Sequence, residues 1–152
     1  MATVQLKAEI KYSKRISQLL KMLNDSEVRR NVNQRIADAI TPYVPMQSGK
    51  LRRSVYVGPQ VISWGRGLPY ARYQFNGEKY EPSIPITRNG EVIGYFSRSD
   101  VPKRPTGEMM GVTTPGTMHH WTDAYQGQLK AEINRQITNY LKRECKARGL
   151  SV

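Results

Sequence analysis

Cysteine and histidine are scarce in this sequence. Its 152 residues include one cysteine, Cys145, and two histidines, His119 and His120. A single thiol cannot close an internal disulfide, and these three side chains do not supply the ligand spacing of a structural zinc site. The composition therefore predicts a fold that is held together by its hydrophobic core, with no metal ion and no other cofactor.

Long apolar runs are also missing. No hydrophobic stretch approaches the roughly 18 residues that a membrane-spanning helix needs. The N-terminal residues MATVQLKAEIKY lack the apolar centre of a signal peptide. We therefore expect a protein that is made in a reducing cytoplasm and has no membrane partner.

Side chains suited to catalysis are equally sparse. A hydrolytic triad needs a nucleophile beside a general base. The two histidines are the only imidazoles, and they precede Trp121 at the predicted entrance of a helix, where packing or capping is the better interpretation. The acidic residues are scattered, and none lies in an apolar segment that would adjust its pKa for acid–base work. The sequence predicts no catalytic residue and no enzymatic activity.

Acidic residues are few, since 12 Asp and Glu stand against 24 Lys and Arg, which gives a formal net charge of +12. Between Ala39 and Gly77 the chain has no acidic residue at all. Four cations of this stretch form the candidate basic patch that faces a partner or DNA: Lys50, Arg52, Arg53 and Arg72. Such a charge suits acidic protein partners or the phosphates of a nucleic acid. Nearby aromatic side chains could stack on bases, so a basic nucleic-acid-binding module is the alternative function.

Apolar spacing predicts a strand and two helices in the first third of the chain. Residues 3–11 alternate between apolar and polar side chains, which is typical of a half-buried strand. Helical spacing follows over residues 16–23 and again over 28–40. Asn24-Asp25-Ser26 separates the two helices, and Pro42 ends the second one.

The middle of the chain predicts short strands and an arm. Four strands are expected in two pairs, each around a turn: 55–57 with 60–64, and 83–86 with 92–96. The second pair flanks Asn89-Gly90, a strong hairpin signal. Residues 97–116 are rich in Pro, Gly, Thr and Met and show no periodicity. We therefore predict an arm over residues 77–116, a hairpin followed by a long loop that neighbouring subunits order.

The last third predicts one long helix. An apolar stripe in four-residue steps over residues 125–141 indicates a helix that is capped by Thr122 or Asp123 and ends near Gly149. At roughly 26 residues it would be about 40 Å long, which is more than a small core needs. Its start is expected to pack on the sheet through Trp121, while its basic last turns project toward a neighbour. The predicted C-terminal docking residues are Lys142, Arg143, Lys146 and Arg148.

Three short motifs follow one another in the sequence. They read PYVPMQSGKLRRS over residues 42–54, ISW over 62–64 and PYARYQFNG over 69–77, and Trp121 then opens the terminal helix. This order resembles the minor capsid proteins of long-tailed bacteriophages, which are also described as neck or tail-completion proteins. The resemblance implies structural roles for Gly49, which turns the chain ahead of Leu51, and for Tyr70, whose small neighbour Ala71 allows close backbone approach. The cations beside Leu51 are then expected to face outward.

The resemblance also implies a function and a location. It implies a non-enzymatic virion protein that forms a ring, a hexamer or a dodecamer, at the head–tail junction and joins the head connector to the tail. Implied partners are further copies of the chain, a head-closure or adaptor protein, and a tail terminator or tail tube, with non-specific contact to DNA. The protein would occupy the neck of the virion and, during assembly, the host cytoplasm.

Taken together, the element order predicts an α+β fold in one connector-type domain over residues 1–152. A small, mainly antiparallel sheet is expected to pack with the N-terminal helix pair and the long C-terminal helix, and the arm extends from it. Helices that are segregated from runs of strands favour this class over alternating βαβ units.

Overall fold

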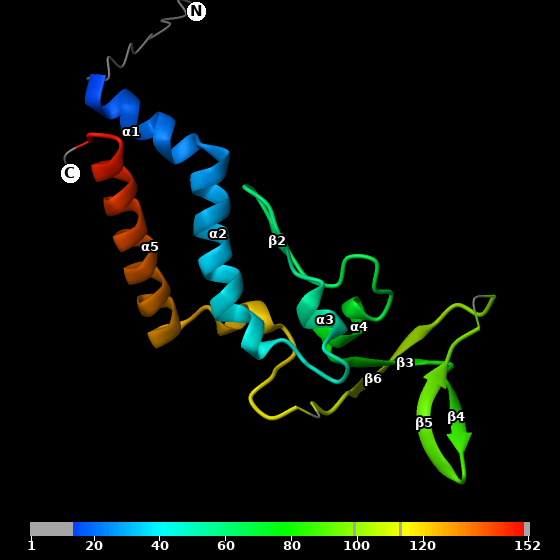
Figure 1. The fold of residues 1–152 in the computed structure, drawn as a ribbon. Helices are drawn as coiled ribbons and strands as arrows, with labels where there is room; N and C mark the ends of the chain where they lie inside the picture. The colour runs from blue at the N-terminus through cyan, green and yellow to red at the C-terminus, as the bar shows by residue number, and fades with distance from the viewer. Residues whose placement is uncertain (1–13, 99, 113, 151–152) are drawn as a thin grey trace, which may run out of the picture.

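Three helices from the two ends of the chain lie together on one side of the molecule (Figure 1). They are α1 (Lys14–Asn24), α2 (Ser26–Ile40) and α5 (Gly127–Ala147). The computed structural model describes residues 14–98, 100–112 and 114–150, so the predicted strand at 3–11 lies outside the described residues. The predicted helix pair is confirmed. Asp25 separates its members and caps α2, because its Oδ1 accepts a hydrogen bond from the backbone N–H of Glu27 at 2.9 Å.

The three helices enclose the first of two hydrophobic clusters, which we call the helical core. Its buried members are Met22, Val28, Tyr140, Cys145 and Leu150. They come from α1, α2 and the last turns of α5, so the two ends of the described chain stabilise each other. Each large apolar side chain buried in this way contributes about 1.5–3 kcal/mol.

A second cluster, the aromatic core, lies where the far end of α2 meets short helices. These are the 3-10 helices η1 (Thr41–Tyr43) and η2 (Trp121–Ala124) and the α-helices α3 (Lys50–Arg53) and α4 (Ala71–Asn76). Its buried members are Ile40, Val44, Leu51, Ala71 and Trp121. Gly65 (φ +81°) passes so close to Ala71 that a Cβ on Gly65 would lie 2.0 Å from the Ala71 Cβ. The close backbone approach expected at Ala71 is therefore present.

The strands form three separate two-stranded antiparallel sheets. The pairs are β1 (Tyr56–Val57) with β2 (Ile62–Ser63), β3 (Glu78–Glu81) with β6 (Arg104–Met109), and β4 (Ile84–Arg88) with β5 (Glu91–Phe96). The predicted α+β class with antiparallel strands is confirmed. The small β1–β2 pair is tied to the helices, because Asn33 of α2 donates a side-chain hydrogen bond to the carbonyl oxygen of Gly58 at 2.7 Å.

The arm extends away from the helices (Figure 1). Strands β3 and β6 form its stem, and β4 and β5 form the predicted hairpin around Asn89 (φ 53°) and Gly90 (φ 84°). Two positive φ angles in succession are typical of the type I′ turn that Asn-Gly favours. The prediction of a loop throughout 97–116 is wrong, because residues Arg104–Met109 form β6. Every residue of β6 is exposed, so no alternation of apolar and polar side chains marks this strand in the sequence.

Helix α5 ends at Ala147, close to the predicted end near Gly149, but it differs from its prediction in where it begins and in where its last turns lie. It begins at Gly127 rather than at the predicted caps, because the backbone leaves the helical region after η2, at Tyr125 (ψ 63°), and is extended at Gln126. The expectation that its last turns project away is also wrong, since Cys145 and Leu150 are buried in the helical core. The buried face of α1 covers these turns. No local pattern in the sequence of α5 predicts this contact.

Candidate assembly surfaces

Helix α3 carries three of the four cations of the predicted basic patch. Gly49 adopts the left-handed conformation (φ 72°) just before the helix, and Leu51 fixes it in the aromatic core. The expected turn ahead of Leu51 is present, and the buried Leu51 anchors the helix. Lys50, beside this anchor, is exposed and lines a hollow of about 390 Å³ together with Tyr70.

Arg52 does not face outward as expected. It is half-buried, and its guanidinium donates hydrogen bonds to two carbonyl oxygens of the preceding loop, at 2.7 Å to Val44 and at 2.6 Å to Pro42. Arg53 donates in the same way to the carbonyl oxygen of Ser48 at 3.1 Å. These two cations bind their own backbone, so Arg52 in particular contributes to the fold of the loop.

Arg72 lies on a different surface from Lys50. It is exposed on α4, its guanidinium lies 5.3 Å from the centre of the Tyr73 ring, and it borders a second hollow of about 440 Å³. We call this hollow the aromatic groove. Its lining includes Ser63, Trp64, Leu68, Phe75, Trp121 and Thr122. The predicted patch thus divides between two neighbouring hollows and a pair of arginines that stabilise the loop.

Trp121 forms the buried part of the aromatic groove. Its ring meets Phe75 edge-on at a centroid distance of 4.8 Å and Trp64 at 6.5 Å. Its indole Nε1–H is buried and has no hydrogen-bond acceptor among the described residues. The predicted burial of Trp121 is confirmed, since its side chain is almost fully buried beside the groove.

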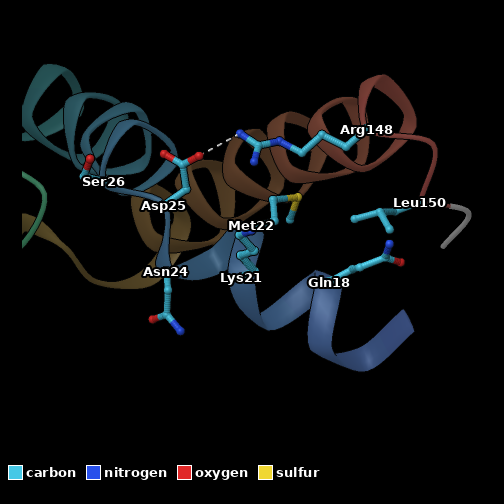
Figure 2. Close-up of a pocket in the computed structure, with 8 residues that line it drawn as sticks. All are labelled: Gln18, Lys21, Met22, Asn24, Asp25, Ser26, Arg148 and Leu150. Carbon is cyan, nitrogen blue, oxygen red and sulfur yellow. Dashed lines mark hydrogen bonds and ion pairs between the residues drawn. The ribbon is translucent and has the colours of Figure 1, made fainter. Parts of the chain in front are cut away.

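The predicted C-terminal docking residues also divide into two groups. Lys142, Arg143 and Lys146 are exposed on α5. Arg148 instead pairs within the chain, at 3.1 Å to Asp25 and at 3.5 Å to Glu144. Figure 2 shows Asp25 at the junction of α1 and α2, joined to Arg148 across the end of α5. Arg148 therefore closes the helical core rather than projecting from it.

Hydrogen bonding to charged and polar neighbours lowers the pKa of Asp25. The largest cause is the backbone N–H of Glu27, and the next is the guanidinium of Arg148. The same ion pair raises the pKa of Arg148. The carboxylate therefore serves the cap of α2 and the closure of the helical core together.

We expect Asp25→Asn to weaken the fold at neutral pH and to have a smaller effect in acid. Asparagine retains the capping oxygen but loses the charge that faces Arg148. Because the pKa of Asp25 in the folded protein lies below its ordinary value of 3.8, the pairing stabilises the fold above that pH and is lost as the pH falls through the folded pKa. Urea midpoints measured at about pH 7 and about pH 2 should differ more from wild type at the higher pH.

The matched control for this pH experiment is Asp38→Asn, an exposed carboxylate on α2 whose side chain accepts a hydrogen bond from Gln34. It removes the same charge without touching α5. An equal loss for Asp25→Asn at both pH values would contradict the ion-pair assignment, because the variant would then act through the cap alone.

His119 holds the base of the arm. Its Nδ1 lies 2.7 Å from the carbonyl oxygen of Gln74 on α4, and its Nε2 lies 2.8 Å from that of Met110, just after β6. Its ring also fills the space beside Gly77, where a Cβ would lie 2.5 Å from the imidazole. The sequence favours packing or capping for the histidines, and His119 packs at the base of the arm. Its part in joining the arm to α4 has no signal in the sequence.

The described residues contain no group of three or more His, Cys, Asp or Glu side chains that could hold a metal ion. In the same residue ranges, no helix has the length and apolarity to cross a membrane. Cys145 is a free thiol, buried with its Sγ 3.7 Å from the Sδ of Met22.

Comparison with known proteins gives one result. The sequence matches the family described as minor capsid protein over residues 4–89, which is more than half of the 152-residue chain. The match includes α1, α2, the aromatic-core helices α3 and α4, and the start of the arm. No curated protein and no solved structure matches.

Proposed function

The chain belongs to the minor capsid protein family of phages, and from this premise we propose that it forms a ring in the neck of the virion, between the head connector and the tail. Membership makes it a phage structural protein that is located in the virion. The neck position, the hexameric or dodecameric ring and the partners are our proposal. These partners are further copies, a head-closure or adaptor protein, and a tail terminator or tail tube.

The observation that carries the proposal is the arm. Its hairpin exposes large apolar side chains, and the described helices do not cover it. Exposed apolar surface on this scale is typical of an interaction site. A structural subunit that holds such a surface away from its own cores is suited to a closed assembly, in which neighbours bury it.

The charge supports a role beside acidic partners. Lys50 and Arg72 are exposed cations in a segment without acidic residues. Several such charges together steer association even where each pair is weak. DNA that passes through the ring would meet the same cations, which is the non-specific contact we propose. Arg66 and Arg72 already lie over the rings of Tyr56 and Tyr73, so these two rings are less suited to stacking on bases.

We expect the double variant Lys50→Glu/Arg72→Glu to fold normally and to block the joining of heads to tails. Each exposed ion pair is worth only about 0.2–1 kcal/mol, but every subunit of a ring would suffer the same reversal. Arg52 is left unchanged, because it stabilises the loop before α3. Electron microscopy of the resulting phage should show separate full heads and free tails, while circular dichroism of the purified variant matches wild type.

The control reverses the same number of charges on α1, with Lys14→Glu/Lys21→Glu, and should yield joined particles. Normal virions from the Lys50/Arg72 variant would show that these cations contact no partner. Immunogold label on wild-type particles away from the neck would contradict the proposed location.

A further inference from the structure

We propose that the β4–β5 hairpin of one copy docks into the aromatic groove of the next copy, so that subunits join head to tail. This inference rests on the proposed ring, and it specifies which two surfaces of the chain meet. The groove is the hollow beside Trp64, Phe75 and Trp121 described above.

The hairpin is a surface that needs a cover. Its exposed apolar side chains are Ile84, Ile86, Val92, Ile93, Tyr95 and Phe96, and Tyr95 is 70% exposed. A two-stranded hairpin is marginally stable alone in water, and each of its outer edges carries unpaired backbone groups. Burial against a second surface would both stabilise the hairpin and pair one of these edges.

The base of the arm keeps the hairpin from covering its own body. The His119 ring contacts the carbonyl oxygens of Gln74 and Met110, and the Met110 backbone N–H donates to the carbonyl oxygen of Gly77 at 2.7 Å. Both chains of the stem are thus tied to α4, and the hairpin lies at the far end of the stem from the helices (Figure 1). Among the described residues no other element covers the hairpin, and we propose that the cover comes from another molecule.

The distribution of charge allows a second copy to be that molecule. Residues 77–116 contain five acidic and five basic residues, so the net charge of +12 lies entirely in the rest of the chain. Two bodies with this charge repel each other. The hairpin itself contains Arg88 and Glu91, which face each other beside the turn, and is otherwise uncharged. It can therefore approach a basic body without that repulsion.

The aromatic groove offers a matching surface on the body. Trp64, Leu68, Phe75 and the buried Trp121 line it. A docked hairpin would bring its exposed apolar side chains to these aromatic rings, and the burial of both surfaces would stabilise the contact.

The two surfaces differ, so the contact is heterologous. Heterologous contacts repeat from copy to copy and close into a ring when the rotation allows. A hairpin that paired with a second hairpin would instead give an isologous contact that stops at a dimer. The mode of association therefore distinguishes these two uses of the hairpin.

A mixing experiment tests the proposal. The donor variant Ile93→Ser/Tyr95→Ser changes only exposed hairpin residues, and the acceptor variant Ser63→Arg/Thr122→Arg places bulky cations at the rim of the groove. The control Gln60→Arg/Gln128→Arg adds the same charge at exposed positions outside the groove. Circular dichroism first checks that each variant is folded. Sedimentation velocity then measures the mass of each protein alone and of the equimolar donor–acceptor mixture.

We expect wild type and the control to assemble beyond dimers, and each of the two variants to remain monomeric. The mixture should give a twofold increase in mass and no more, since only the intact hairpin of the acceptor variant and the intact groove of the donor variant can pair. Assembly of the acceptor variant like wild type, a mixture that stays monomeric, or a monomeric wild type would each overturn the proposal. If virions show a neck ring despite such a result, only the contact between hairpin and groove is refuted and the proposed function stands. If mixing succeeds but the protein is absent from the neck, only the proposed function is refuted.

Discussion

Removal of residues 142–152 is expected to unfold the protein. The deletion takes away Cys145 and Leu150, two of the buried members of the helical core, and leaves Met22 without its cover. It also removes Arg148, the partner of Asp25. Truncation of one large core side chain typically costs about 2–5 kcal/mol, and whole domains are stable by only about 5–15 kcal/mol. The combined loss therefore approaches or exceeds the total stability.

Thermal unfolding followed by circular dichroism measures this effect, and the truncated chain should show no cooperative transition. The matched control is the full-length variant Lys142→Gln/Lys146→Gln, which neutralises two exposed cations of the same segment and should unfold near the wild-type temperature. A cooperative transition of the truncated chain close to that of wild type would show that the last turns of α5 project from the fold after all.

Trp121→Ala is expected to destabilise the protein by roughly 3–5 kcal/mol, as for other buried aromatic truncations. Trp121 is 3% exposed and meets Phe75 and Trp64 edge-on. Aromatic pairs of this kind contribute about 0.5–1.5 kcal/mol beyond the burial of their area. Its removal leaves a cavity at the point where η2 meets α4 and the β2 strand, so the loss includes a cavity term.

Urea unfolding measures the Trp121→Ala effect, and Trp121→Phe provides the comparison. Phenylalanine retains an aromatic ring and removes an N–H that has no acceptor in the described part of the chain, so we expect a clearly smaller loss than for alanine. Equal losses for the two variants would contradict the assignment of the stability to ring packing. Little loss with alanine would mean that Trp121 is not part of the core.

Elements with a local signal could be predicted from the sequence. Apolar residues three or four positions apart over 16–23 and 28–40 indicate α1 and α2, and Asn89-Gly90 indicates the β4–β5 hairpin, because these patterns depend on residues close together in the sequence. The family could be recognised from the ordered motifs around Gly49 and Ala71. The α+β class then follows from the order of the elements.

Features that depend on distant contacts could not be predicted in this way. Arg52 reads as a free cation, but the loop before α3 places two carbonyl oxygens within its reach. Strand β6 has no apolar alternation because it pairs with β3 outside any core. The C-terminal end of α5 resembles a basic projection because four cations outnumber Cys145 and Leu150 there, although those two residues determine the packing.

His119 contacts both Gln74 and Met110 and so joins the base of the arm to α4. The hairpin lies at the far end of the stem from the helices (Figure 1). A small rotation of the arm about its base would therefore displace the hairpin by a larger distance. In a head-to-tail ring, the angle between successive copies determines how many copies close the circle. The orientation of the arm at His119 would therefore determine the curvature of such an assembly, although His119 lies inside one subunit and away from the contact surfaces.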